Sequence, residues 1–203
     1  MPPSAPEGYI ALLRSTVAIA GQEPLVVRRG IYGGLGFAAF SAFWTSAALL
    51  LAGPHYGYDA AVIGLFSLFG VAGMLMANVA GRLADRGRAR PARLAMFLIM
   101  LASFGLLALG ETRLAAFIAG VVLLDLAVQG AHILNQGEIY AVRPEARSRV
   151  TSVYMTLYFA GGALGSALSA VLWDAGGWRA VCALGAGAAA LGLLVWAGER
   201  RMT

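Results

Sequence analysis

Long apolar runs separated by short polar breaks dominate the chain. A helix needs about 20 apolar residues to cross the hydrocarbon core of a bilayer. Backbone polar groups find no water in that core, so runs of this length must form helices. The pattern predicts six spanning helices, over residues 30–52, 60–80, 93–110, 114–139, 150–172 and 178–197.

The breaks between these runs contain residues that end or begin helices. Gly53 and Pro54 end the first run, and Asp59 is expected to cap the second. Residues 82–93 are predicted to form a charged turn. Gly176 and Gly177 separate the last two runs.

Composition strengthens the membrane prediction. The 203 residues are 60% hydrophobic and 12% charged, whereas soluble domains are about 45–50% apolar and about 25% charged. The excess apolar surface is expected to face a lipid bilayer. The 27 glycines predict closely packed helices, since small residues let backbones approach where lipid gives no hydrophobic drive for association.

The arginines indicate how the helices are oriented. All 15 basic residues are arginine, and all but Arg113 and Arg179 fall on one side of the six predicted spans. The positive-inside rule then places both termini in the cytoplasm, with a bacterial plasma (inner) membrane as the expected location. We interpret these arginines as topology markers in short loops, so no nucleic-acid partner is expected despite a pI of about 9.9.

Residues 1–27 are expected to be a cytoplasmic leader that resembles a linker, followed by a six-helix domain over 28–203. The leader lacks the basic start, apolar core and cleavage site of a signal peptide. The apolar bias of residues 9–20 predicts a helix lying at the membrane face.

The residues present argue against enzyme and metal chemistry. Cys182 is the single cysteine, and His55 and His132 are the only histidines, so neither a disulfide nor a metal site is expected. With no lysine, the chain has no phosphate-binding Walker loop. Ser166 follows His132, the reverse of the order in rhomboid-type proteases. We therefore predict no enzyme activity and no cofactor, and expect an ion gradient, such as a proton gradient, to supply energy.

One turn has a recognisable signature. Residues 81–90 read GRLADRGRAR. This pattern resembles the loop signature of the major facilitator superfamily, and nearly the whole chain is similar to the second six-helix half of such a transporter, specifically of efflux or antiporter type. In that family the turn braces neighbouring helices and helps gate their movement. The resemblance implies this role for Gly81, Asp85, Arg86, Arg88 and Arg90, and Asp85 is expected to accept hydrogen bonds from a nearby helix N-terminus.

The resemblance also implies a fold. The expected fold is an all-α polytopic membrane protein with six transmembrane helices as two inverted three-helix repeats, half of a major facilitator fold, and a substrate site near the membrane midplane. The resemblance implies that the leading helix of each triplet, the first and the fourth, lines the central cavity. A second six-helix half is then expected as a partner, either a separate chain or a second copy.

The fourth run contains a stripe of polar residues. Asp125, Gln129, His132 and Gln136 fall within about 60° of arc at about 100° per helical residue, and Asn135 lies to one side. A stripe of this kind facing lipid would cost several kcal/mol, so it must face water or protein. Asp125 lies about 18 Å from the outer end of the helix, near the middle of the hydrocarbon core.

These residues form the candidate site. Ionisable groups at this depth are functional candidates, so Asp125 is expected to load and release a proton, with His132 as a relay. For every candidate, packing between helices is the alternative that the sequence leaves open. Further candidates for the cavity wall that would contact a small-molecule substrate are polar or aromatic residues of the fourth and first helices: Gln129, Asn135, Gln136, Ser41, Trp44 and Thr45.

The sequence thus predicts half of a transmembrane transporter, with proton-coupled secondary transport or efflux of a small polar or amphipathic solute by alternating access. The alternative is a truncated, non-transporting membrane subunit or remnant of such a transporter.

Overall fold

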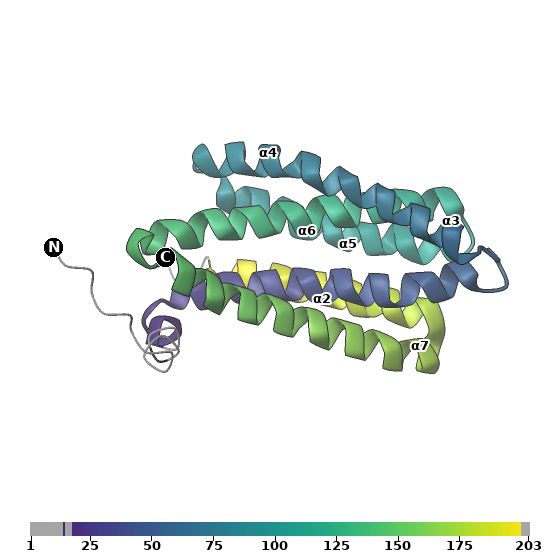
Figure 1. The fold of residues 1–203 in the computed structure, drawn as a ribbon. Coiled ribbons are helices and arrows are strands. Elements are labelled where there is room, and N and C mark those ends of the chain that lie inside the picture. The colour runs from purple at the N-terminus through teal and green to yellow at the C-terminus, as the bar shows by residue number, and fades with distance from the viewer. Residues whose placement is uncertain (1–13, 15–17, 200–203) are drawn as a thin grey trace.

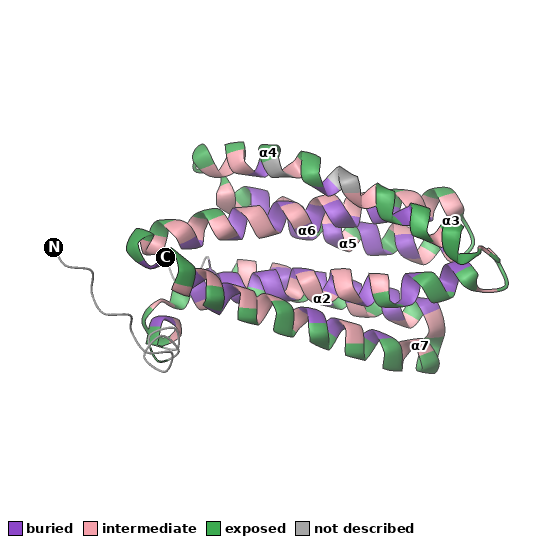
Figure 2. Ribbon diagram, in the orientation of Figure 1, coloured by how far each residue is buried: buried purple, intermediate pink, exposed green. Residues whose placement is uncertain are grey.

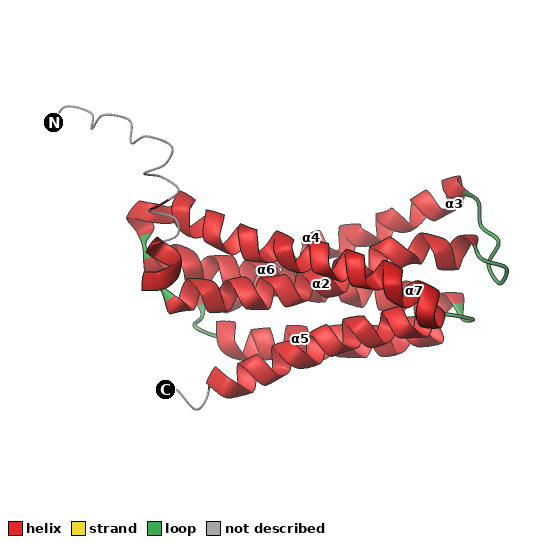
Figure 3. Cartoon of the chain, turned by 90° about the horizontal axis from the view of Figure 1, so that it is seen from below, coloured by secondary structure: helices red, strands yellow, loops and turns green. Residues whose placement is uncertain are grey.

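The computed structural model describes residue 14 and residues 18–199, with backbone alone at Val71, Ala72 and Ala77. Long helices lie side by side in one bundle, and the described residues include no strand (Figures 1 and 3). Most of the predicted leader helix over 9–20 lies outside the described residues. The elements are α2 (Pro24–Ala52), α3 (Ala60–Leu65), η1 (Phe66–Gly70), α4 (Val71–Asp85), α5 (Ala89–Leu109), α6 (Leu114–Val142), η2 (Pro144–Ala146) and α7 (Arg147–Glu199).

Among the described residues, five continuous helical stretches are long and apolar enough to cross a membrane. The last of them contains α7, which is folded in two at Gly177, where φ is 62° and ψ is −153°. The two arms of α7 run back alongside one another, so the chain crosses the bundle six times (Figure 1). α2 begins and α7 ends at the same end of the bundle. The predicted all-α fold with six spans is confirmed.

The helices pack as two interlocked triplets. α2 packs mainly against α7, whereas α6 packs mainly against α4 and α5. The leading helix of each triplet is therefore held by the two later helices of the other triplet. This reciprocal arrangement is what two inverted three-helix repeats produce, and it places α2 and α6 next to one another in the bundle.

Aromatic rings join these helices near the end at which α7 turns. Phe43 of α2, Phe117 of α6 and Trp178 of α7 lie with ring centroids between 5.8 and 6.0 Å apart. The Trp178 indole also donates a hydrogen bond to the carbonyl of Leu107 at 2.7 Å. Buried residues face the middle of the bundle, whereas α4 and the first arm of α7 present many exposed residues (Figure 2).

The helix ends differ from the sequence prediction in informative ways. Asp59 caps α3 as predicted, since its Oδ1 accepts a hydrogen bond from the backbone N–H of Val62 at 2.8 Å. The charged turn predicted over 82–93 is much shorter, because α4 continues to Asp85 and α5 begins at Ala89. α2 begins at Pro24, six residues before the predicted start at residue 30, because the fixed φ of proline suits the first turn of a helix.

The second span is not one uninterrupted helix. The sequence predicted a continuous α-helix over 60–80. This prediction is wrong, because a 3₁₀ segment, η1 (Phe66–Gly70), separates α3 from α4. The segment contains no proline, so proline is not the cause of the interruption. The contact that stabilises the new helix start at Val71 comes from another helix and is described below.

Candidate functional site

Asp125 lies in the interface between α6 and α4. The residue is 5% exposed, and its Oδ2 atom accepts a hydrogen bond from the backbone N–H of Gly73 at 2.9 Å. None of the residues that the structure describes forms an ion pair with this carboxylate. Gln129, one turn along α6, is half-buried beside the same glycine. Asp125 and Gln129, the first part of the predicted stripe, therefore contact α4.

The rest of the stripe faces the first arm of α7. Nδ1 of His132 lies 2.9 Å from the hydroxyl of Tyr154, and the His132 ring lies 4.7 Å from the ring of Tyr158, measured between centroids. Gln136 follows on α6 as a half-buried residue. A cluster of one imidazole and two phenols thus lies between α6 and α7, on the side of Asp125 nearer the end of the bundle where α2 begins.

Two of the three candidates on α2, Ser41 and Thr45, lie against the same arm of α7. Thr45 donates a hydrogen bond to the carbonyl of Ser41 at 2.7 Å, and its hydroxyl is 2.8 Å from that of Ser166. Trp44 packs edge-on against Phe43, with ring centroids 5.0 Å apart. The hydroxyl of Thr45 therefore links two helices, which is the packing role that the sequence left open.

Phe37, an aromatic residue near Ser41 in the first predicted run, joins the two groups of residues. Phe37 of α2 stacks on Tyr158 with ring centroids 4.3 Å apart and planes inclined by 14°. Through this stack, α2 contacts the cluster around His132. The signal in the sequence was the spacing of Phe37 from Ser41, which is one helical turn.

Asn135 belongs to a buried charge cluster at the end of the bundle where α2 begins. Its Oδ1 accepts a hydrogen bond from Nε of Arg93 at 3.0 Å, and Nη2 of Arg93 lies 2.7 Å from Oε1 of Glu138. Glu138 also pairs with Arg29, which in turn donates to Glu199. Two arginines and two glutamates from α2, α5, α6 and α7 thus neutralise one another where water is largely excluded.

This cluster corrects part of the sequence interpretation. Arg29 and Arg93, interpreted as topology markers in loops, lie within helices and are 7% and 0% exposed. Asn135, a predicted cavity residue, is fully buried because the face of α6 that carries it packs on α5. The sequence did contain a signal: Glu138 and Glu199 are acidic residues at the ends of apolar helices, where each needs a cation.

The predicted gating turn connects α4 to α5. Gly87 has a φ of 69°, a left-handed conformation that favours glycine, and the backbone N–H of Arg88 closes the turn on the carbonyl of Leu83 at 2.9 Å. Asp85 and Arg86 are exposed. The hydrogen bond expected from a helix N-terminus to Asp85 is absent among the described residues, since no side chain caps α5.

Gly81 and Arg90 lie on the helices that flank this turn. Gly81 is half-buried in the last part of α4. Arg90, in the first turn of α5, places its guanidinium 5.2 Å from the ring centroid of Trp196 on the second arm of α7. A cation over an aromatic face is favourable, so Arg90 stabilises the contact between α5 and α7. It lies on a helix and is not part of the turn itself.

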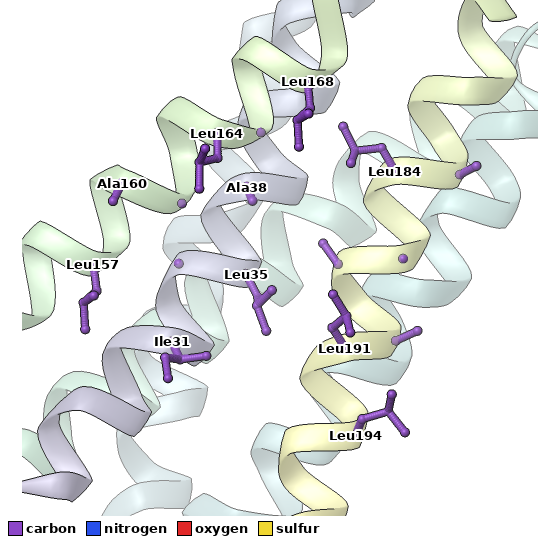
Figure 4. A pocket seen from close by; sticks show the side chains of 17 residues that line it. Ile31, Leu35, Ala38, Leu157, Ala160, Leu164, Leu168, Leu184, Leu191 and Leu194 are labelled. Atoms are coloured by element: carbon purple, nitrogen blue, oxygen red, sulfur yellow. The ribbon is translucent and has the colours of Figure 1, made fainter. Parts of the chain in front are cut away.

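An apolar groove lies between α2 and the two arms of α7, with a volume of about 690 Å³. Leucines and small residues line it, including Leu35, Leu164 and Leu191 (Figure 4). None of the predicted proton or substrate residues is in its lining. The groove is therefore separate from the polar stripe of α6.

The fold and the buried polar groups define a polytopic α-helical membrane protein made of two inverted triplets. A family model described as Major Facilitator Superfamily matches residues 31–202, and the chain belongs to that superfamily of transporters. The predicted family is thereby confirmed.

Two curated relatives extend this result. The chain is 46% identical over 188 residues to YgaY of Escherichia coli strain K12, which is named as an uncharacterized transporter; the match covers 93% of this chain and 48% of YgaY. It is 41% identical over 161 residues to the probable transporter SCO4007 of Streptomyces coelicolor, covering 78% of this chain and 36% of that protein. The chain thus spans half or less of the length of these relatives. No solved structure matches it.

Proposed function

We propose that this chain is one half of a proton-coupled secondary transporter that exports a small polar or amphipathic solute by alternating access. A second six-helix half, supplied by another polypeptide segment or by a second copy, completes the transport path. The bundle lies in a bacterial inner membrane with α2 beginning, and α7 ending, on the cytoplasmic side.

The observation that carries the proposal is the state of Asp125. The carboxylate is buried in the membrane-spanning part of the bundle, and none of the described residues neutralises it with a cation. By contrast, Glu138 and Glu199 are each paired with arginines. A membrane-buried carboxylate without a counter-ion favours binding a proton.

The neighbourhood of Asp125 supports a polar path. His132 and Tyr154 are within hydrogen-bond distance, and Tyr158 lies beside both rings. Imidazole and phenol groups can exchange protons or bind a polar solute. The apolar ring of Phe37 next to them suits an amphipathic solute better than a strongly hydrated one.

A flux assay tests the proposal. The chain, alone and together with a matching first half, is placed in sealed vesicles with an imposed pH difference, and proton movement is followed with a pH-sensitive dye while panels of solutes are added. We expect Asp125→Asn to abolish solute-dependent proton flux while inserting normally. The matched control is Asp174→Asn, which removes an exposed carboxylate near the turn of α7.

Unchanged flux in the Asp125→Asn variant would remove this residue from the mechanism. If neither the chain nor the assembled pair moves any solute, the alternative holds: a non-transporting subunit or remnant of a transporter.

A further inference from the structure

The start of α4 lies inside the membrane-spanning part of the second span. Thirteen residues separate Ala60, the first residue of α3, from Gly73, which corresponds to about 20 Å at about 1.5 Å per residue. A 3₁₀ segment within a helix often marks a hinge. The first N–H groups of the new helix have no acceptors within it, and lipid offers none.

Asp125 supplies that acceptor from α6. Gly73 is the third residue of α4, and its N–H donates to Asp125 Oδ2 at 2.9 Å. The other carboxylate oxygen lies 3.8 Å from the position that a Cβ atom would take at Gly70, the residue that precedes the helix. The carboxylate therefore lies over the first turn of α4, where the helix dipole stabilises a negative charge.

Glycine at position 73 makes this contact sterically feasible. A Cβ atom there would overlap Oδ2 of Asp125 and would come within 2.7 Å of Cγ of Gln129. Any larger side chain must displace the carboxylate or push α4 away from α6. The pair Asp125 and Gly73 is thus a specific polar contact between two helices.

Few apolar side chains of the second span are fully buried. In the described part of the second span, Phe66 and Ala80 are the buried apolar residues, whereas Met74, Leu75 and Val79 are 63%, 72% and 48% exposed. The apolar packing of α4 on the bundle comes from half-buried side chains such as Met76 and Leu83, and the bond to Asp125 is the polar contact at the start of the helix.

We infer that ionised Asp125 holds the start of α4 against α6 through Gly73, and that protonation of Asp125 releases it. This inference rests on the proposed function and supplies a way in which proton binding there moves a helix. A carboxylate accepts a stronger, charge-assisted hydrogen bond than a neutral acid does, and only the charged form benefits from the helix dipole. Among the described residues, Tyr158 of α7 is the titratable group that interacts with Asp125. His132, two turns along α6, contacts the ring of the same Tyr158.

Hydrogen exchange of the α4 backbone tests the inference. The protein is placed in lipid nanodiscs at neutral and acidic pH, and exchange is corrected for the intrinsic effect of pH on amide chemistry. For the wild type we expect peptides from the first half of α4 to exchange about 5-fold faster at acidic pH, the effect of weakening one charge-assisted hydrogen bond. Asp125→Asn should show fast exchange at both pH values.

Two further variants make the outcome decisive. Gly73→Ala should also abolish the pH dependence, because its methyl group displaces the carboxylate, whereas Asp174→Asn should retain it. An α4 that exchanges equally at both pH values in the wild type, or that keeps its pH dependence in Asp125→Asn, overturns the inference.

The inference and the proposed function fail in distinguishable ways. Loss of proton flux in Asp125→Asn with wild-type exchange of α4 would leave Asp125 as a proton carrier and discard its role in holding the helix. Wild-type proton flux in Asp125→Asn, together with pH-insensitive exchange of α4, would keep the role of Asp125 in holding the helix and discard its role as a proton carrier.

Discussion

Nη2 of Arg93 and Oε1 of Glu138 lie 2.7 Å apart in a part of the bundle where none of the Arg93 side chain is exposed. Arg29 also pairs with Glu138, so one carboxylate contacts two guanidinium groups, and Glu199 supplies the second negative charge. The pairing joins α2, α5 and α6 at one end of the bundle. The Arg93 side chain is fully buried and the Glu138 side chain is 24% exposed, so an arginine left without its partner has little water to replace it.

Replacing Glu138 by glutamine should therefore destabilise the bundle strongly. The change leaves two buried arginines short of a counter-ion, and removing one partner of a buried pair costs about 3–5 kcal/mol. Equilibrium unfolding in detergent and denaturant mixtures measures the loss. Glu145→Gln, at an exposed residue of η2, should change the free energy of unfolding by less than about 0.5 kcal/mol. Equal effects of the two changes would show that the cluster does not stabilise the fold.

The hydrogen bond between His132 and Tyr154 should contribute modestly to stability. Polar contacts between membrane helices have coupling energies of about 0.6 kcal/mol, because the separated helices also find partners. A double-mutant cycle with His132→Phe and Tyr154→Phe measures this coupling, and Tyr140→Phe in place of Tyr154→Phe serves as the control. A coupling of several kcal/mol would indicate that the pair is part of a larger network.

Close packing of α2 against α7 should depend on Gly161. A Cβ atom at this position would overlap the backbone of Gly34, so valine there must force the two helices apart. We expect Gly161→Val to cost about 1–3 kcal/mol in unfolding free energy. Gly187→Val is the matched control, since nothing lies within 4 Å of the Cβ position there. Equal stability of the two variants would contradict the close approach of the helices.

The reversal of α7 should depend on Gly177. Its φ of 62° and ψ of −153° fall in a region that is essentially restricted to glycine, and other residues pay about 1–3 kcal/mol to occupy it. Gly177→Ala should therefore lower the thermal midpoint, whereas Gly187→Ala in the following arm should not. A thermal melt in detergent compares the two, and a Gly177→Ala variant as stable as the wild type would contradict the assigned backbone conformation.

The spans and several of their ends could be predicted residue by residue. Asp59 was expected to cap a helix and does so, and the break at Gly177 was expected between the last two runs. The interruption at Phe66–Gly70 could not be predicted, because it is stabilised by Asp125, which lies 52 residues from Gly73 in sequence. The sequence predicted that the polar stripe faces water or protein and left the choice open. In the structure its residues divide between contacts with α4 and contacts with α7.

By itself, the sequence determined that this protein crosses a bilayer as a bundle of helices, and its loop signature indicated the family. Both conclusions follow from local properties of the sequence. Within a lipid bilayer, an apolar segment must satisfy its own backbone hydrogen bonds, which a helix does. The tertiary structure alone decided the partner of each buried polar group, pairing Glu138 with Arg93 and Asp125 with the backbone of Gly73. Those pairings depend on which helix faces come together. Helix packing is set by shape and by contacts across the whole bundle, and no short stretch of sequence contains that information.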